Sequence, residues 1–229
     1  MSTILQERKG MEKKFNICFE GPDCAGKSIL IEKFQEVYTG NTKVIQEVKG
    51  ELGDLIRNGT TDALEQFGLL IYLRRQAIKE AKNSKVMINI FDRFVWSTMA
   101  YQGQYISRDL INIVFNNMIP VGFIDVLFLV LPERSVVRKR LRNRSVLDKI
   151  ENYYTTDQVY NYYQSLIYFP GRNPSAISTK MRSFCKEIVV LSGDYRVDLK
   201  IITNVIKRLT GVYPKTENAK RVYRSNNRI

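Results

Sequence analysis

The chain has 229 residues, of which 44% are hydrophobic and 11% aromatic, so it carries enough apolar material for one compact domain with a buried core. It contains no histidine, which excludes chemistry that uses imidazole as a base or as a metal ligand. Its formal net charge of +13 favours polyanionic partners: nucleic acid, or a site that holds several phosphate groups; the plain alternative is a solvated basic face.

Segments for targeting or membrane anchoring are not expected from the sequence. It has no apolar run of about eighteen residues, which predicts that nothing spans a membrane. Residues 1–14 carry charges where a signal peptide needs an apolar core. Cys18, Cys24 and Cys185 show no pairing or metal-binding spacing, so a cytoplasmic, reducing location is expected.

Short apolar segments rich in β-branched and aromatic residues alternate with longer periodic segments. The expected strands are 14–20, 43–48, 85–91, 124–131 and 187–191. The expected helices are 27–38, 62–82, 108–118, 133–143, 156–167 and 196–210. Several strands are continuous apolar runs, which is typical of strands buried on both faces. The alternation predicts an α/β fold with a five-stranded parallel sheet between layers of helices.

The segment GPDCAGKS at 21–28 matches the phosphate-binding pattern G-x-x-x-x-G-K-[ST], between an expected strand and an expected helix. Lys27 is expected to reach the β- and γ-phosphates of ATP, and Ser28 to bind Mg²⁺. Cys24 is interpreted as a small loop residue, because phosphoryl transfer needs no thiol nucleophile. The expected ATP-binding residues are Gly21, Pro22, Asp23, Cys24, Ala25, Gly26, Lys27, Ser28 and Ile29.

A second polar pair, Asp92 and Arg93, follows the expected strand 85–91. The carboxyl ends of strands in open α/β sheets border the crevice where ligands bind. Asp92 is therefore expected to hold Mg²⁺ through water, and Arg93 to bind a phosphate with its forked guanidinium. The alternative interpretation is a structural ion pair at a strand end.

In combination, these motifs resemble the thymidylate kinase family of nucleoside-monophosphate kinases. FEGPDCAGKS (19–28) is similar to that family's FEGxDGxGKS/T opening, and DRFVWSTMAYQG (92–103) to its DRYxxSSxAYQG segment. Weaker similarities follow in the family's order: QEVKGELGDLIR (46–57), LLIYLRR (69–75), PE (132–133), Arg138, Asp148 and Glu151. The resemblance implies a three-layer P-loop NTPase fold with an arginine-rich lid.

The resemblance also implies a division of the chain into three parts. The parts are an N-terminal extension (1–13), a kinase domain (14–211) with a lid at about 138–150 and an insertion at 168–186, and a basic tail (212–229).

Roles in binding the acceptor follow from the same resemblance. Asp23 would meet the 3′-hydroxyl of the deoxyribose, and Arg57 and Arg93 would hold the monophosphate. Tyr101 stands where the family's tyrosine crowds the 2′ position, so that ribose is disfavoured.

For the acceptor base, the resemblance implies a hydrogen bond from Arg75 and a contact between Thr98 and a ring nitrogen. Ile71 stands where the family has a stacking phenylalanine, so Tyr72 or Phe67 would supply the stacking, or it would be absent. This departure leaves dTMP, dUMP and modified pyrimidine acceptors open, and a divergent, viral enzyme is one hypothesis that fits. The other implied substrate-binding positions are Glu47 and Gln102.

Family members carry their catalytic arginine either in the P-loop or in the lid. The variable loop positions 23–25 are not basic here, so the resemblance implies that the lid supplies it. Arg142 is the first choice, with Arg140 and Arg144 as alternatives.

The predicted function is Mg²⁺-dependent transfer of the ATP γ-phosphoryl group to a deoxynucleoside monophosphate, dTMP in the first place, with Lys27, Asp92 and a lid arginine as catalytic residues. The first alternative is a deoxynucleoside kinase, which needs a carboxylate base and usually has Glu-Arg-Ser where this chain has Asp-Arg-Phe. The second is a non-catalytic module that binds nucleotides or nucleic acid. Because the family is generally dimeric, a homodimer is expected, and neither nucleic acid nor membrane is an expected partner.

Overall fold

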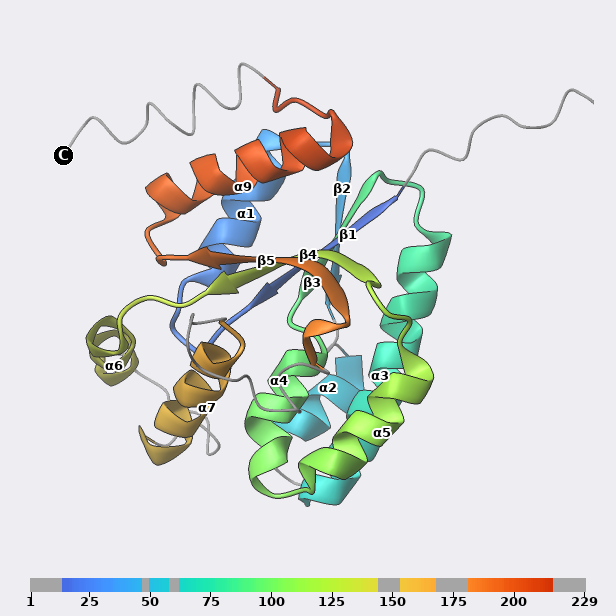
Figure 1. Ribbon diagram of the computed structural model, residues 1–229, viewed down its shortest axis with the longest axis vertical. Helices are drawn as coiled ribbons and strands as arrows, with labels where there is room; N and C mark the ends of the chain where they lie inside the picture. Colours follow the sequence, from blue (N-terminus) through green and yellow to red (C-terminus); the bar gives the residue numbers. More distant parts are fainter. Residues whose placement is uncertain (1–13, 47–49, 58–61, 144–152, 168–180, 216–229) are drawn as a thin grey trace, which may run out of the picture.

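The structure is a computed structural model that describes residues 14–46, 50–57, 62–143, 153–167 and 181–215 (Figure 1). Within these residues five parallel strands form one sheet in the order β2-β3-β1-β4-β5, which confirms the predicted α/β fold. The strands are β1 (Phe15–Glu20), β2 (Thr42–Gln46), β3 (Ile88–Asp92), β4 (Ile124–Val130) and β5 (Cys185–Leu191).

Helices cover both faces of the sheet (Figure 1). One face carries α1 (Lys27–Val37) and α9 (Tyr195–Thr210). The other carries α3 (Ala63–Asn83), α4 (Val95–Tyr101), α5 (Arg108–Met118) and α7 (Tyr153–Ser165). The remaining described helices are α2 (Gly50–Arg57), the short 3₁₀ helix η1 (Gln102–Gln104) and α6 (Arg134–Arg142). None of the helices in these described stretches is both long and apolar enough to cross a bilayer.

Central strands contribute to two apolar cores because successive residues point to opposite faces. Ile17 and Phe19 of β1 join the core beneath α1 and α9. Cys18 between them joins the core on the other face, as does Leu127 of β4. All four side chains are fully buried, which explains the continuous apolar runs of these strands.

Two helices, α2 and α4, were not predicted from the sequence. Residues 95–100 of α4 are all buried, so this helix has no polar face and no amphipathic period to detect. Helix α2 contains Gly50 and Gly53, which disfavour a helix locally. By contrast, Asp62 gives α3 a recognisable start, because its carboxylate accepts hydrogen bonds from two backbone N–H groups of the first turn.

The carboxyl ends of four strands meet at one edge of the sheet and lead into loops that carry polar residues. These loops follow β1, β3, β4 and β5. The predicted 1–13 extension, most of the 168–186 insertion and most of the 212–229 tail lie outside the described residues. The last residues of that insertion belong to β5, and Lys215 at the start of the tail donates its backbone N–H to Val37 O at 3.2 Å.

Candidate functional site

The loop between β1 and α1 curls tightly, and its first glycine is required for steric reasons. Gly21 has a φ of 145°, and a Cβ there would lie 2.1 Å from the backbone oxygen of Val130 at the end of β4. Gly26, with a φ of 105°, ends the loop and begins α1, so the amide groups of the first helical turn face the loop interior. This arrangement favours an anion at the helix N-terminus.

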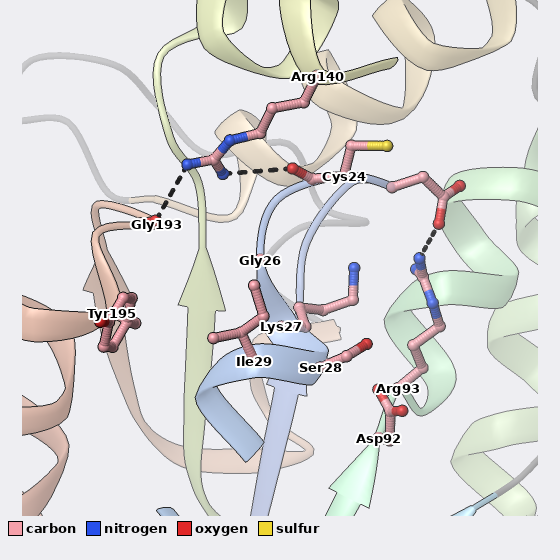
Figure 2. A pocket seen from close by; sticks show the side chains of 11 residues that line it. Cys24, Gly26, Lys27, Ser28, Ile29, Asp92, Arg93, Arg140, Gly193 and Tyr195 are labelled. Atoms are coloured by element: carbon pink, nitrogen blue, oxygen red, sulfur yellow. Dashed lines mark hydrogen bonds and ion pairs between the residues drawn. The ribbon is translucent and has the colours of Figure 1, made fainter. Parts of the chain in front are cut away.

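A cavity of about 600 Å³ opens beside this loop (Figure 2). Its lining includes predicted site residues from the loop, from the end of β3 and from α6: Asp23, Cys24, Gly26, Lys27, Ser28, Ile29, Asp92, Arg93 and Arg140. Two further lining residues were not predicted: Gly193 in the loop after β5 and Tyr195, the first residue of α9. Figure 2 shows Tyr195 on the opposite side of the cavity from Asp92 and Arg93. The cavity is therefore bordered on one side by Asp92 and Arg93 and on the other by residues that the motifs do not mark.

Lys27 is almost completely buried and occupies the centre of the loop. Its Nζ donates to the backbone oxygens of Gly21 at 2.9 Å and Pro22 at 2.7 Å. Burial lowers the pKa of the Lys27 ammonium to about 8, and the neighbouring Arg93 guanidinium acts in the same direction. The ammonium is still mostly charged at neutral pH, so it can exchange these carbonyls for phosphate oxygens.

The affinity of the cavity for ATP is expected to fall about tenfold from about pH 7 to about pH 9, because a lysine with a pKa of about 8 loses most of its charge over that interval. Protonated Lys27 attracts phosphate and neutral Lys27 does not, so affinity is full below the pKa and declines above it. Calorimetric titration with MgATP across this range checks the slope. Lys27→Arg should give a flat profile, since guanidinium stays charged; an equal slope in both proteins would contradict the assignment.

Ser28 and Asp92 line the same cavity as Lys27, and the charge of Asp92 acts on the Lys27 ammonium. Mg²⁺ typically keeps several waters and takes one or two protein oxygens together with substrate phosphates. Among the described residues there is no group of three or more His, Cys, Asp or Glu that could form a metal cage. One hydroxyl and one carboxylate therefore fit an Mg²⁺ that arrives with a nucleotide.

Cys24 adopts the left-handed conformation, with a φ of 61°. Its position in the chain is a glycine in the FEGxDGxGKS/T pattern, which explains the conformation. A non-glycine residue in this region costs about 1 kcal/mol. Cys24 contributes a backbone carbonyl to the site, because that oxygen accepts a hydrogen bond from Arg140 at 3.3 Å.

Cys24→Ala is expected to keep kcat/KM within about twofold of the natural protein, because alanine has a similar conformational cost and keeps the same carbonyl. Steady-state ATP turnover checks this expectation. A loss of tenfold or more would show that the thiol itself takes part in the site.

Asp23, Arg93 and Tyr101 form a cluster, and the first two of these residues line the cavity. The Asp23 carboxylate accepts hydrogen bonds from Arg93 Nη2 and from the Tyr101 hydroxyl. The Arg93 guanidinium also donates to Gly21 O at 3.2 Å and lies 5.4 Å from the centre of the Tyr101 ring. Burial raises the pKa of Tyr101 well above its usual value, so this phenol stays a hydrogen-bond donor. Three residues predicted to meet the acceptor are thus brought together.

The lid arginines are separated by the geometry of α6. Arg140 Nη1 donates to Ala25 O at 3.0 Å. Its Nη2 donates to Gly193 O at 3.3 Å (Figure 2). Arg142, the first choice from the sequence, is exposed. Residues two positions apart in a helix point about 200° away from each other, so Arg140 and Arg142 cannot both face the loop. The structure therefore places Arg140, not Arg142, at the P-loop, and Arg144 lies outside the described residues.

Arg75, which the resemblance assigns to the acceptor base, and its neighbour Arg74 have different surroundings on α3. Arg75 is exposed, whereas Arg74 is fully buried and donates to the Thr98 hydroxyl and to Phe94 O at 2.8 Å. Thr98 thus pairs with Arg74 and not with Arg75. Ile71 is half-buried and packs against the core on this face of the sheet.

The two aromatic residues that were expected to supply the stacking in place of Ile71 have different surroundings. Phe67 is buried and packs edge-on against Phe115 at 6.0 Å between ring centres. Tyr72 is exposed on α3. Gln102 is nearly buried and begins η1. Glu47 and the side chain of Arg57 lie outside the described residues.

Sequence reasoning missed the carboxylate of Glu20 and the loop after β5. The signal for Glu20 in the sequence is a charged residue at the end of a mostly apolar strand. The loop after β5 is held by Asp198 of α9, whose Oδ2 accepts from Gly193 N at 2.7 Å and whose Oδ1 accepts from Ser192 N at 2.9 Å. A Cβ at Gly193 would lie 2.9 Å from Ala25 O, so the close approach of this loop to the P-loop requires glycine. The turn sequence SGDY after an apolar strand was the available signal.

Comparison with known proteins agrees with this geometry. The family model for thymidylate kinase matches residues 19–179, more than half of the chain. A thymidylate kinase of Mycoplasma capricolum is 34% identical over 185 residues, which cover 70% of this chain and 84% of that protein.

Solved structures with similar folds match most of the chain. A thymidylate kinase from Ehrlichia chaffeensis has a TM-score of 0.54 at 23% identity and covers 83% of this chain and 99% of that one. A deoxyadenosine kinase from M. mycoides with bound dATP has a TM-score of 0.59 at 14% identity and covers 84% and 100%. At these identities the structural likeness shows the fold alone, whereas the family match extends over the P-loop, the Asp23–Arg93–Tyr101 cluster and α6. The chain belongs to the thymidylate kinase family.

Proposed function

We propose that this protein transfers the γ-phosphoryl group of ATP to the phosphate of dTMP and so forms dTDP and ADP. The observation that carries the proposal is that the P-loop residues Lys27 and Ser28 line the same cavity as Asp23 and Arg93, and that Tyr101 donates to Asp23. A triphosphate bound at Lys27 would therefore present its last phosphate to an anionic group bound at Arg93.

The donor side is built from residues that recognise a triphosphate and its base. Lys27 and the α1 N-terminus would bind the β- and γ-phosphates, and Ser28 with Asp92 would hold Mg²⁺, which supplies charge neutralisation when bound. Arg140, already at the rim of the loop, would place positive charge on the transferred group. Tyr195 offers a ring to the donor base on the far side of the cavity.

The acceptor side would hold a deoxynucleoside monophosphate. Arg93 would bind the acceptor phosphate with its fork, and Arg57 is proposed as a second phosphate ligand. Asp23 would accept from the 3′-hydroxyl, and the Tyr101 ring beside it would leave little room for a 2′-hydroxyl. The cluster would have to open when the acceptor enters, since Arg93 and Tyr101 now share the Asp23 carboxylate.

The transfer needs no general base, because the acceptor phosphate oxygen is already an anion. That oxygen forms a bond to the γ-phosphorus, the bond from the γ-phosphorus to the bridging oxygen breaks, and its electrons leave with ADP. Catalysis is then positioning and charge neutralisation. A nucleoside kinase would instead need a carboxylate to take the proton of a 5′-hydroxyl.

For the acceptor base we assign Arg74 in place of Arg75, since Arg74 contacts Thr98. A pyrimidine that binds here would take over one of the hydrogen bonds that Arg74 now makes. Arg74→Lys is expected to raise the KM for dTMP by about tenfold, because lysine loses the forked geometry. Arg75→Lys, the adjacent matched change, should leave KM within about twofold. Equal effects of the two changes would contradict the assignment.

An ADP-release assay with ATP, Mg²⁺ and a panel of acceptors tests the proposal. The panel contains dTMP, dUMP, dCMP, dGMP, dAMP, thymidine and deoxyadenosine. We expect turnover with dTMP and none with either nucleoside. Turnover with a nucleoside and with no monophosphate would establish the nucleoside kinase instead.

A homodimer and a reducing, intracellular location are proposed together with this activity. The location is supported by the sequence, in which Cys18, Cys24 and Cys185 show no pairing or metal-binding spacing. Gel filtration with light scattering tests the dimer.

A further inference from the structure

Glu20 is a fully buried carboxylate at the end of β1, directly before the P-loop. Its Oε1 accepts from the backbone N–H groups of Phe94 at 2.6 Å and Ser97 at 3.2 Å. Its Oε2 accepts from the hydroxyls of Ser97 and Tyr163, each at 2.7 Å. A buried charge is costly unless donors surround it, so these bonds are what hold Glu20 in place.

The bonds of Glu20 control the turn that presents Arg93. Arg93 lies in the left-handed region with a φ of 70°, an uncommon conformation for a side chain of this size. Its backbone N–H donates to Phe19 O at 3.0 Å, and the next N–H, that of Phe94, donates to Glu20. Adjacent residues of β1 therefore hold both amides of the turn, and a strained turn persists only where its surroundings determine it.

Tyr163 connects this turn to the other side of the cavity. It lies on α7, which is held to α6 by the ion pair between Asp157 and Arg138. Helix α6 also carries Arg140, which contacts the P-loop. A hydrogen bond from Tyr163 to Glu20 thus links the helices beside the donor phosphates to the arginine that faces the acceptor.

Glu20 itself is not placed to touch a substrate. It does not line the cavity, its side chain has no exposed surface, and both of its oxygens already accept hydrogen bonds. The carboxylates that line the cavity are those of Asp23 and Asp92. Glu20 can therefore act on the reaction only through the residues that it holds.

We infer that Glu20 and Tyr163 are positioning residues for the acceptor: their hydrogen bond sets the turn at Arg93 and thereby the affinity for the acceptor phosphate. The inference rests on the proposed function in that the acceptor is taken to be dTMP. It predicts that loss of this hydrogen bond changes the KM for the acceptor and not the KM for ATP. The turn positions the arginine that binds the acceptor phosphate, whereas ATP binds to the P-loop amides.

Two adjacent tyrosines provide a matched test. Tyr163→Phe removes the hydrogen bond to Glu20, whereas Tyr162→Phe removes a buried hydroxyl that has no hydrogen-bond partner among the described residues. Steady-state kinetics with ATP and dTMP should show a rise of about tenfold in the KM for dTMP for Tyr163→Phe, with the KM for ATP unchanged, as the loss of one hydrogen bond to a charged group implies. Tyr162→Phe should leave both KM values within about twofold. Equal behaviour of the two variants, or an equal rise in both KM values, would overturn the inference.

A second variant tests whether the two residues act through one bond. Glu20→Gln should also raise the KM for dTMP, and the double variant Glu20→Gln with Tyr163→Phe should be no worse than Glu20→Gln alone. Additive effects would overturn the shared mechanism. Thermal unfolding midpoints establish that each variant is folded.

If the natural protein does not phosphorylate dTMP, the proposed function is refuted. The inference about Glu20 and Tyr163 is then tested by a separate measurement. Binding of radiolabelled inorganic phosphate, with the P-loop saturated by ADP, is then compared among the same variants. The inference stands if Tyr163→Phe weakens phosphate binding and Tyr162→Phe does not. It fails if the two bind phosphate equally.

Discussion

Lys27→Ala is expected to lower kcat/KM by about a thousandfold or more, the largest effect of any single change in this protein. Lys27 is the cation at the centre of the P-loop, and its ammonium already makes two hydrogen bonds to carbonyl oxygens there. Alanine would leave those oxygens facing the incoming phosphates with no compensating charge. Both nucleotide binding and the stabilisation of the transferred group should therefore suffer.

Lys33→Ala is the matched control for Lys27→Ala. Lys33 lies on the same helix, is partly exposed and pairs with Glu36 at 2.7 Å on the surface. Such surface pairs contribute little, so activity should change by less than about twofold. Retention of a tenth or more of the natural activity by Lys27→Ala would contradict the assigned role of Lys27.

Arg93→Ala is expected to lower kcat/KM for dTMP by at least about a hundredfold, mainly through a higher KM for dTMP, because the forked contact to the acceptor phosphate is lost. The same change leaves the Asp23 carboxylate without its cation, which makes the acceptor end more repulsive to a phosphate. The KM for ATP should change much less, since Lys27 and the α1 N-terminus are intact. Arg93→Lys should recover part of the activity, as it restores charge without the fork.

Arg208→Ala provides the control for Arg93→Ala. Arg208 also donates to a carboxylate, with Nη2 at 2.7 and 2.8 Å from the two Glu187 oxygens, but the pair is on the surface and away from the cavity. Its removal should leave both KM values unchanged. Were Arg93→Ala to raise the KM for ATP as much as that for dTMP, Arg93 would belong to the donor site and the acceptor assignment would be wrong.

The sheet and the P-loop could be predicted from the sequence because their signals are local. Short apolar segments rich in β-branched and aromatic residues marked all five strands, and the loop pattern contains its own glycines and lysine. Helix α4 gave no such signal, since burial on all sides removes the amphipathic period. The amphipathic pattern requires an exposed polar face, so it does not indicate a helix that is buried on all sides.

The site residues that sequence reasoning misplaced are those whose orientation depends on helix rotation. Arg74 and Arg75 are neighbours in the chain but lie about 100° apart on α3, and only packing against Thr98 decides which one turns inward. Arg140 and Arg142 differ in the same way on α6. Similarly, nothing local in the sequence joins Glu20 to Tyr163, because their contact spans 143 positions.

The central claim is that the γ-phosphoryl group of ATP is transferred to a phosphate and not to a hydroxyl or to water. Phosphorus NMR of the protein with ATP, Mg²⁺ and dTMP tests this claim most directly, since the new bond creates a β-phosphorus signal in the product. We predict that the signals of dTDP and ADP grow together and that no inorganic phosphate accumulates ahead of them. Inorganic phosphate and ADP without dTDP, or conversion of added thymidine to its monophosphate while dTMP stays unchanged, would contradict the account.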